Sequence, residues 1–230
     1  MQSKKRLIIH ESEPMKLFLD TADVEAIKRA NDTGLLDGVT TNPTHIAKTG
    51  RAFTGVVSEI CRIVDGPVSA EAVGSNTDEF IAEAKKIADI APNIYVKIPM
   101  TVDGIRAVRV LENELDIRVN VTMIFSSTQA LMAMKADASY VSIVLSRLDA
   151  YANESGVLIE DSVRIKSNYK FNSEVLAGSV KTQNQILTCL RAGVDIATVP
   201  ESLFFQFYQH PLTTMGIEQF ERDWASVKNQ

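Results

Sequence analysis

The feature that most constrains the fold is a regular alternation of short β-branched runs with amphipathic helical segments along almost the whole chain. Each of the runs predicted to be a strand is followed by a segment in which apolar residues have helical spacing. The predicted strands cover residues 15–20, 38–41, 67–73, 93–99, 118–125, 140–145, 174–179 and 196–199. Eight such units in 230 residues predict an α/β fold, the (β/α)8 TIM barrel, whose usual size is about 250 residues.

The alternative fold is an open, doubly wound sheet, which binds ligands through a glycine-rich turn after its first strand. Here the first predicted strand ends in Asp20-Thr21-Ala22-Asp23, which contains no glycine. No repeat or long linker divides the chain, so we expect one barrel domain over residues 15–230 that includes an extra C-terminal helix. Residues 1–14 are predicted to be a poorly ordered N-terminal extension.

Composition and charge argue against several classes of partner. The net charge of −5 disfavours a nucleic-acid partner, because proteins that bind nucleic acids usually present a strongly basic face. No apolar segment approaches the roughly 20 residues that cross a bilayer, so no membrane partner is expected. Cys61 and Cys189 are predicted to be two buried thiols in a reducing, cytoplasmic compartment. The three histidines are scattered, so no histidine-based metal site is predicted.

The predicted strand at residues 93–99 contains one lysine among apolar residues, Lys97. Alternation along a strand places Tyr95 and Lys97 on one face and Ile94, Val96 and Ile98 on the other. Burying an unpaired ammonium group is costly, and proteins usually avoid that cost by neutralising the amine. A neutral buried amine can condense with a ketone to form a Schiff base. The alternative is a lysine that reaches water or pairs with a carboxylate.

Polar and charged residues gather at the carboxyl ends of the predicted strands. In a barrel these ends converge on one mouth, where active sites are built. Each residue also has a local alternative: Asp20 could cap a helix, Asn42 could belong to a turn before Pro43, and Thr122 could be a wall residue. Taken together they predict an active site, and the candidates are Asp20, Thr41, Asn42, Glu71, Lys97, Thr122, Ser142, Arg147, Ser179 and Lys181.

Six short motifs, in this order and at these spacings, resemble those of the transaldolase family. The likeness is to its short-chain branch, which includes the fructose-6-phosphate aldolases, and it runs from Met15 to about Trp224. The resemblance implies a (β/α)8 barrel of the class I aldolase type that needs neither a metal ion nor an organic cofactor. The motifs are Leu19-Asp20-Thr21-Ala22, Asp37-Gly38-Val39-Thr40-Thr41-Asn42-Pro43, Val68-Ser69-Ala70-Glu71, Val96-Lys97-Ile98-Pro99, Asn120-Val121-Thr122 and Arg147-Leu148-Asp149.

By that resemblance, Lys97 is the Schiff-base lysine and Asp20 takes the proton from the C4 hydroxyl of the sugar. Glu71 and Thr122 hold the water that moves protons during Schiff-base formation. The chemistry is consistent with these roles, because a retro-aldol step needs an electron sink at C2 and a base near the C4 hydroxyl. The resemblance assigns the substrate to the remaining candidates: Asn42, Thr41 and Ser142 for the sugar, and Arg147, Ser179 and Lys181 for its phosphate.

The chain departs from the family pattern at two positions. Strand six of the family commonly has an aromatic residue where this chain has Val144. The loss of the aromatic side chain removes one wall of the expected substrate pocket. Lys181 stands where many transaldolases have arginine, which replaces a bidentate fork by a point charge, although lysine also occurs in the aldolase branch. Glu71 favours the transaldolases, because the aldolase branch carries glutamine there.

Three functions remain open at this point. The first is a transaldolase that moves a dihydroxyacetone unit between sugar phosphates in a pentose phosphate type of carbohydrate metabolism. The second is an aldolase that releases free dihydroxyacetone, and the third is a non-catalytic protein that binds sugar phosphates. The resemblance also implies a homo-oligomer, a pentamer or a decamer, because the C-terminal helix of this branch reaches over a neighbouring subunit. Residues 213–224 have the matching helical spacing, with Ile217, Phe220 and Trp224 on one stripe.

Overall fold

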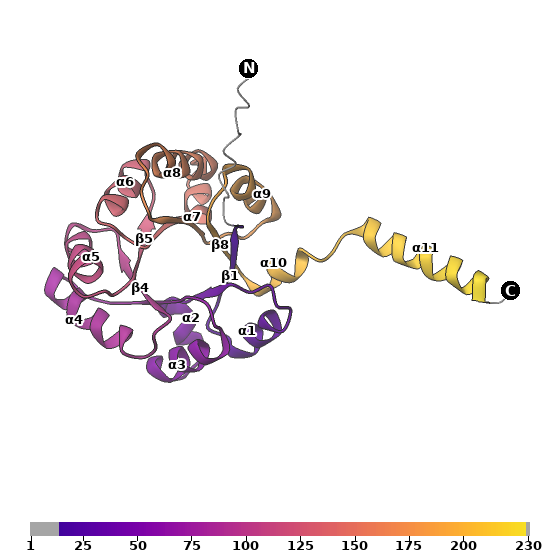
Figure 1. Cartoon of the computed structure of the whole chain (residues 1–230), viewed down its shortest axis with the longest axis horizontal. Coiled ribbons are helices and arrows are strands. Elements are labelled where there is room, and N and C mark those ends of the chain that lie inside the picture. The colour runs from indigo at the N-terminus through magenta and orange to yellow at the C-terminus, as the bar shows by residue number, and fades with distance from the viewer. Residues whose placement is uncertain (1–13, 229–230) are drawn as a thin grey trace, which may run out of the picture.

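The computed structural model describes residues 14–228, and the predicted poorly ordered extension lies almost entirely outside them. Eight parallel strands close into a barrel in chain order, with β1 paired to both β2 and β8 (Figure 1). The predicted TIM barrel is therefore confirmed. The strands are β1 (Lys16–Asp20), β2 (Gly38–Thr40), β3 (Val68–Glu71), β4 (Ile94–Pro99), β5 (Val119–Ile124), β6 (Tyr140–Val144), β7 (Glu174–Gly178) and β8 (Ile196–Val199).

Helices surround the barrel and bury their apolar faces against the outer face of the strands (Figure 1). Asp23 begins the first helix, because its side chain accepts hydrogen bonds from the backbone N–H groups of Glu25 and Ala26. The helices are α1 (Val24–Asn31), α2 (Pro43–Lys48), α3 (Phe53–Ile63), α4 (Thr77–Ala88), α5 (Val102–Glu114), α6 (Ser127–Lys135), α7 (Leu145–Ala150), α8 (Ser155–Tyr169), α9 (Gln183–Ala192), α10 (Glu201–Gln206) and α11 (Pro211–Lys228).

The structure differs from the sequence-based expectation after β6. The predicted strand ran to residue 145, but β6 ends at Val144 and residues 145–150 form the short helix α7. Leu145 is buried and Leu148 packs against the core, so an i, i+3 apolar pair holds this single turn on the barrel. The sequence analysis did not predict this helix, because two apolar residues are too short a pattern to indicate one.

Large side chains fill the amino-terminal half of the barrel interior. Phe18, Tyr95, Tyr140, Leu176 and Ile196 form one buried cluster, in which the rings of Tyr95 and Tyr140 stack with centroids 4.3 Å apart. Phe18 lies beside Gly38 of β2, where an added Cβ atom would come within 2.7 Å of the ring. The cluster closes one end of the barrel, so any substrate must enter from the other end.

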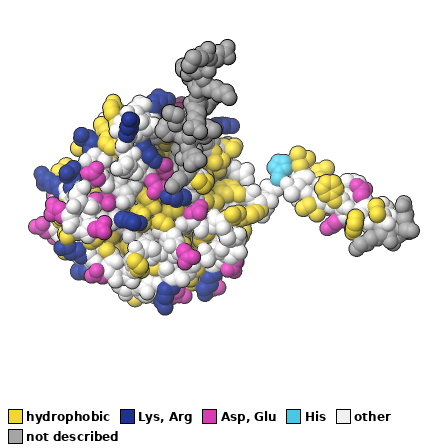
Figure 2. All heavy atoms as spheres, in the orientation of Figure 1, with side chains coloured by type: hydrophobic (Ala, Val, Ile, Leu, Met, Phe, Trp, Pro, Cys, Tyr) yellow, Lys and Arg dark blue, Asp and Glu magenta, His cyan; other side chains and the backbone are white. Residues whose placement is uncertain are grey.

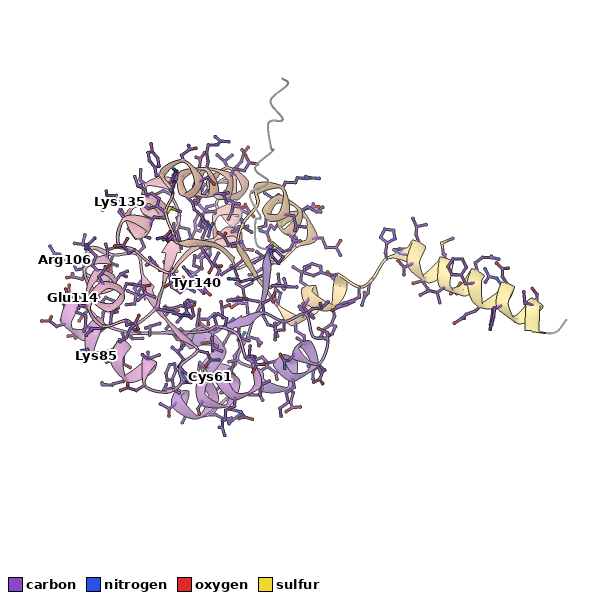
Figure 3. The ribbon with its side chains drawn as sticks, in the orientation of Figure 1. Cys61, Lys85, Arg106, Glu114, Lys135 and Tyr140 are labelled. Atoms are coloured by element: carbon purple, nitrogen blue, oxygen red, sulfur yellow. The ribbon has the colours of Figure 1, made fainter. Side chains whose placement is uncertain are left out.

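The next positions along the same strand faces are polar. Side chains two residues apart on a strand point to the same face and lie one level apart. Lys97 therefore lies one level above Tyr95, and Ser142 one level above Tyr140. The barrel interior thus changes from aromatic to polar toward the carboxyl ends of the strands. Figure 3 shows the contrast between Tyr140 inside the barrel and Glu114 on the outer helices.

The last helix, α11, extends away from the barrel beyond α10 (Figure 1). Its hydrophobic side chains are exposed in this single chain, and Figure 2 shows them along the helix. A monomer rarely exposes a contiguous apolar stripe of this kind. The exposed large residues are Leu212, Met215, Ile217, Phe220, Trp224 and Val227.

The two cysteines are free thiols on the helices that surround the barrel. Cys189 is fully buried and Cys61 is partly buried, so the prediction of two buried thiols is confirmed fully for the first and in part for the second. Burial raises the pKa of Cys61 to about 11 and that of Cys189 to about 12. Within residues 14–228, no helix combines the length and hydropathy that a membrane span requires.

Glu112 joins three elements at the closed end of the barrel. Its carboxylate accepts hydrogen bonds from the backbone N–H groups of Val119 and Ser139, each at 2.7 Å, and from the Ser139 hydroxyl at 3.2 Å. These bonds connect α5 to the first residue of β5 and to the residue before β6. Burial raises the pKa of Glu112, and the bonds from Val119 and Ser139 oppose that shift.

We predict that Glu112→Ala lowers the free energy of unfolding by about 2–4 kcal/mol, because two partly buried N–H groups lose their acceptor. Chemical denaturation monitored by circular dichroism measures the change. The control is Glu114→Ala, which removes an exposed carboxylate from the same helix and should change stability by about 0.5 kcal/mol or less. Equal effects of the two substitutions would contradict the role given to Glu112.

Candidate active site

Lys97 lies inside the barrel and is only 8% exposed. Its Nζ atom donates a hydrogen bond to the Thr41 carbonyl oxygen at 3.1 Å and lies 3.4 Å from Oε2 of Glu71. The pairing follows from the register, because Glu71 of β3 stands directly opposite Lys97 of β4 and both side chains point inward. Of the two alternatives considered for this lysine, a neutral unpaired amine and a lysine that reaches water or pairs with a carboxylate, the structure has the pairing with a carboxylate.

This pairing is compatible with nucleophilic chemistry at Lys97. A carboxylate at 3.4 Å is close to the protons of the amine, so Glu71 can accept one of them directly or through a single water molecule. Thr41 contributes its carbonyl oxygen to the lysine, while its buried hydroxyl donates to the Ser69 carbonyl oxygen at 2.8 Å. The Thr41 hydroxyl is thus already used in joining β2 to β3.

Asp20 ends β1 at the open end of the barrel, with its side chain 23% exposed. The alternative role considered for it, capping a helix, is performed by Asp23 instead. Oδ1 of Asp20 accepts a hydrogen bond from the Thr40 hydroxyl at 2.9 Å. Asp20 is therefore a carboxylate held at the mouth by a neighbouring strand and free for chemistry there.

Asn42 has a structural role that leaves part of its side chain available. Its Oδ1 atom caps α2 by accepting the backbone N–H of His45 at 2.9 Å, and Pro43 occupies the first position of the helix. The turn expected at Asn42-Pro43 is thus a helix N-cap. The Nδ2 amide of Asn42 is not needed for the cap, so it can donate to a ligand.

Thr122 and Ser142 are each 5% exposed and belong to the inward-facing positions of β5 and β6. Thr122 lies one level nearer the mouth than Asn120, which stands opposite Lys97 in the β4–β5 register. Ser142 faces Gly178 of β7, where an added Cβ atom would come within 3.2 Å of its hydroxyl. Both predicted residues therefore lie in the polar part of the barrel that also holds Lys97.

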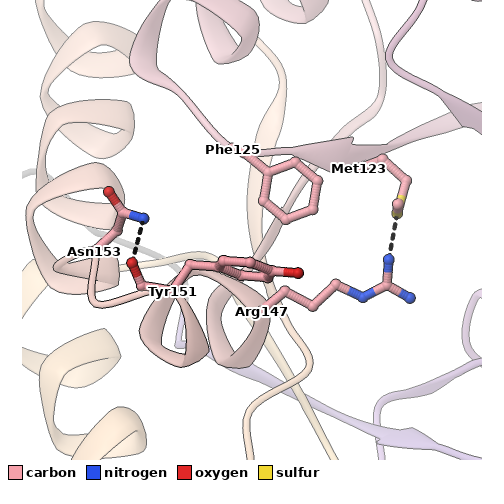
Figure 4. Close-up of a pocket in the computed structure, with 5 residues that line it drawn as sticks. All are labelled: Met123, Phe125, Arg147, Tyr151 and Asn153. Atoms are coloured by element: carbon pink, nitrogen blue, oxygen red, sulfur yellow. Dashed lines mark hydrogen bonds between the residues drawn. The ribbon is translucent and has the colours of Figure 1, made fainter.

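Arg147 lines a cavity of about 570 Å³ at the carboxyl ends of β5 and β6 (Figure 4). Its guanidinium Nη1 contacts the sulfur of Met123 at 3.8 Å, and no salt bridge to Arg147 occurs within residues 14–228. Met123 lies within an irregularity of the β5–β6 register, between Val121 and Ile124, and has a left-handed backbone, with φ at 62°. The aromatic side chains of Phe125 and Tyr151 line the same cavity.

Ser179 and Lys181 follow β7, and the structure does not join their side chains to Arg147. The Ser146 hydroxyl of α7 donates to the Ser179 carbonyl oxygen at 2.5 Å, so the two regions are in contact. Lys181 is exposed, and no hydrogen bond links its side chain or that of Ser179 to Arg147 in the described chain. Two cations near one point repel each other until an anion lies between them. The predicted phosphate-binding group is thus adjacent but not assembled.

Two further residues of the site escaped the sequence analysis. His45 was considered only as a metal ligand, but one turn into α2 its Nε2 atom lies 3.7 Å from Oδ1 of Asp20. Burial is the largest influence on the pKa of His45 and lowers it; Asp20 opposes this, and Lys48 and Lys97 add to the lowering. Its place three residues after the N-cap of a helix at the mouth was the signal available in the sequence.

Asn120 is the second missed residue. It is fully buried, and its Nδ2 atom donates to the Ser69 hydroxyl at 3.1 Å. Its Oδ1 atom is the only buried side-chain oxygen or nitrogen without a hydrogen-bond partner in the described part of the chain. Such an atom at the level of Lys97 can accept a hydrogen bond from a bound hydroxyl. Its inward position follows from that of Thr122, two residues along the same strand.

A groove of about 600 Å³ runs from Asp20 and His45 toward the N-terminus of α1 and the start of α10. Five carboxylates and two cations, Lys48 and Arg51, line it, and Arg51 is paired with Glu59 at 2.6 Å. The lining of the groove therefore has more carboxylates than cations. Its lining residues are Asp20, Thr21, Ala22, Asp23, Val24, Glu25, His45, Lys48, Thr49, Arg51, Glu59, Pro200 and Glu201.

Solved structures share the fold of this chain at low sequence identity. An orotidine 5'-monophosphate decarboxylase from Methanocaldococcus jannaschii aligns with a TM-score of 0.56 and 18% identity, covering 80% of this chain and 87% of that one. An inosine 5' monophosphate dehydrogenase from Legionella pneumophila aligns with a TM-score of 0.56 and 13% identity, covering 80% of this chain and 57% of that one. These likenesses concern the barrel alone.

Sequence comparisons identify the family, which the fold alone does not. A protein of Aquifex aeolicus called a probable transaldolase is 50% identical over 213 residues, covering 93% of this chain and 98% of the relative. A probable transaldolase 1 of Listeria monocytogenes is 50% identical over 214 residues, covering 93% of this chain and 100% of the relative. Residues 17–230 match the family described as Transaldolase/Fructose-6-phosphate aldolase. The chain therefore belongs to the transaldolase/fructose-6-phosphate aldolase family.

Proposed function

We propose that this enzyme is a cytoplasmic transaldolase that transfers a dihydroxyacetone unit from a ketose phosphate to an aldose phosphate through a Schiff base on Lys97. The observation that carries the proposal is the buried Lys97 amine with the Glu71 carboxylate 3.4 Å from it. The free thiols of Cys61 and Cys189 are consistent with a reducing compartment. Relatives that are 50% identical and called probable transaldolases support the same activity.

The first stage is condensation. Glu71 takes a proton from the ammonium group of Lys97, and the neutral amine attacks C2 of the ketose to give a carbinolamine. A water molecule held by Glu71 and Thr122 passes protons to the departing oxygen, which leaves as water. The product is an iminium between C2 and Nζ. The unpaired Oδ1 of Asn120 and the free amide of Asn42 are available to hydroxyls of the bound sugar.

The second stage is cleavage and transfer. Asp20 accepts the proton of the C4 hydroxyl, the C3–C4 bond breaks, and its electron pair moves into the iminium to form an enamine. An aldose phosphate leaves. An acceptor aldose then takes its place, the enamine attacks its aldehyde, and Asp20 returns the proton to the new hydroxyl. Hydrolysis of the resulting iminium releases a new ketose phosphate, which is three carbons longer than the acceptor aldose, and restores the amine of Lys97.

Phosphate recognition is proposed for Arg147, with Ser179 and Lys181 beside it. The only side-chain hydrogen bond of Arg147 within residues 14–228 goes to a sulfur atom, so its guanidinium remains available to an anion. A dianionic phosphate would draw the exposed Lys181 toward Arg147, because it offsets the repulsion between the two cations. Ser142 is proposed to contact the sugar from β6, and Thr41 to act through the carbonyl oxygen that holds Lys97.

An aldolase that releases dihydroxyacetone is the second candidate, and Val144 favours it. This residue faces the barrel interior where the family commonly has an aromatic side chain, so the enamine has less cover from water. Water would then protonate the enamine before an acceptor arrives. Measuring free dihydroxyacetone with and without an acceptor aldose separates the two candidates. A non-catalytic binding protein, the third alternative, would produce neither product.

We predict that Lys97→Met abolishes turnover of every ketose donor, because methionine fills a similar volume without a nucleophile. A coupled assay for the released aldose phosphate measures the loss, which should exceed about 10³-fold. Thermal unfolding must show that the barrel is retained. Normal turnover in a folded Lys97→Met protein would remove the Schiff-base mechanism.

We predict that Arg147→Ala raises KM for phosphorylated donors about 10- to 100-fold, because a charge-assisted hydrogen bond contributes roughly 1.5–3 kcal/mol. Steady-state kinetics with free dihydroxyacetone as the donor supply the comparison, and its KM should change little. Arg164→Ala, on the exposed outer face of α8, is the matched control. Equal losses on phosphorylated and unphosphorylated donors would show that Arg147 is structural.

We also propose that the enzyme is a homo-oligomer, a pentamer or a decamer of two pentamers, joined through α11. The helix extends from the barrel (Figure 1), and its stripe of Ile217, Phe220 and Trp224 is exposed in the single chain. A neighbouring copy that covers this stripe would present its own α11 to the next copy. Repeated head-to-tail contacts of this kind close into a ring when the rotation between copies permits it.

We predict that truncation after His210 converts the oligomer to monomers, because it removes the whole of α11. Light scattering coupled to size-exclusion chromatography measures the mass, which for the intact chain should be a multiple of 25.3 kDa. A full-length chain that remains monomeric at micromolar concentration would refute the proposed assembly.

A further inference from the structure

Two threonine hydroxyls meet inside the barrel beneath Asp20. Thr40 of β2 and Thr198 of β8 lie on either side of β1, and their Oγ1 atoms are 2.7 Å apart. The Thr40 hydroxyl also lies 2.9 Å from Oδ1 of Asp20. The two threonines are only 3% and 2% exposed, so these hydroxyls are largely shielded from solvent.

The direction of the hydrogen bonds is determined by how many protons are present. A carboxylate can only accept, so the single hydroxyl proton of Thr40 is donated to Asp20. The contact between the threonines then requires Thr198 to be the donor and Thr40 the acceptor. If Thr40 donated to Thr198 instead, Asp20 would lose its donor and the proton of Thr198 would need another acceptor. Among the described residues, the hydroxyl of Thr198 has no hydrogen bond except that with Thr40.

This chain of bonds distinguishes the two oxygens of Asp20. Oδ1 accepts from Thr40 and has the imidazole Nε2 of His45 at 3.7 Å. Oδ2 has no hydrogen-bond partner among residues 14–228. A proton placed on Oδ1 would bring a third proton to these two contacts, so one of the three hydroxyl protons would lose its acceptor, at a cost comparable to a buried unsatisfied polar group. A proton on Oδ2 leaves the chain intact.

We propose that Thr40 and Thr198 are positioning residues that hold Oδ1 of Asp20, so that Oδ2 alone exchanges the proton with the C4 hydroxyl of the sugar. The inference rests on the proposed transaldolase function and adds residues to its cleavage step. The two hydroxyls act through Asp20 and touch no substrate. They are needed for breaking and forming the carbon–carbon bond, while condensation at Lys97 proceeds without them.

The test compares Thr40→Val, Thr40→Ser and Thr198→Val in the full-length enzyme, because valine keeps the shape of threonine and serine keeps its hydroxyl. We expect Thr40→Val to lower kcat about 10- to 100-fold, with the donor KM within about threefold of the wild type, since small displacements of a catalytic group have effects of this size. Thr40→Ser should recover most of the loss. Thr198→Val should give a smaller loss in the same direction.

Borohydride trapping with a ketose donor separates the two steps. All three variants should still gain the covalent mass of the reduced adduct, as should Asp20→Ala, which lacks the base for cleavage. Ser162→Ala, which removes a buried hydroxyl bonded to Leu158 on the outer helix α8, is the matched control and should keep kcat within twofold.

Three results would overturn the inference. The first is a kcat for Thr40→Val within twofold of the wild type, and the second is an equal loss in the serine and valine variants. The third is a folded Thr40→Val protein that no longer traps the donor. If the wild type itself traps no donor, the proposed function fails and the inference fails with it; a trapping wild type with an unaffected Thr40→Val removes the inference alone.

Discussion

The structure of the site depends on one buried ion pair, that between Lys97 and Glu71. An ammonium group can lie inside a barrel only if its charge is balanced, because desolvation of an isolated charge costs several kcal/mol. The β3–β4 register provides the balance by placing Glu71 opposite Lys97, and the Thr41 carbonyl oxygen from β2 adds a hydrogen bond. Three neighbouring strands therefore fix one amine beside the only carboxylate that lies within 4 Å of it in the described chain.

The barrel makes this arrangement reachable by a substrate from one side only. The cluster around Tyr95 and Tyr140 closes the far end, and the polar level above it contains Asn120, Thr40 and Thr198 as well as the lysine. Asp20 lies at the mouth, held through Oδ1. The proposed condensation deep in the barrel and the proposed proton transfer near its opening thus involve different strands, which suits a ketose bound along the barrel axis.

Much of this architecture could be predicted from the sequence. Strand–helix alternation gave the barrel, and the face shared by Tyr95 and Lys97 followed from the period of two along β4. The pairing of Glu71 with Lys97 could not be predicted in that way, because register between strands distant in sequence depends on the closed barrel. The same limit explains the missed contacts of His45 and of Thr40 with Thr198, which join different βα units. The motif resemblance identified Arg147, but only the structure shows its cavity with Phe125 and Tyr151.

The central claim is that the buried amine of Lys97 forms the covalent bond to the sugar. The most direct test is to reduce the wild-type enzyme with borohydride in the presence of a ketose phosphate and to locate the modification by peptide mass spectrometry. The account predicts one added dihydroxyacetone-derived or ketose-derived group per chain, on the peptide that contains Lys97. Modification of another lysine, or no covalent mass with a donor that the enzyme turns over, would contradict it.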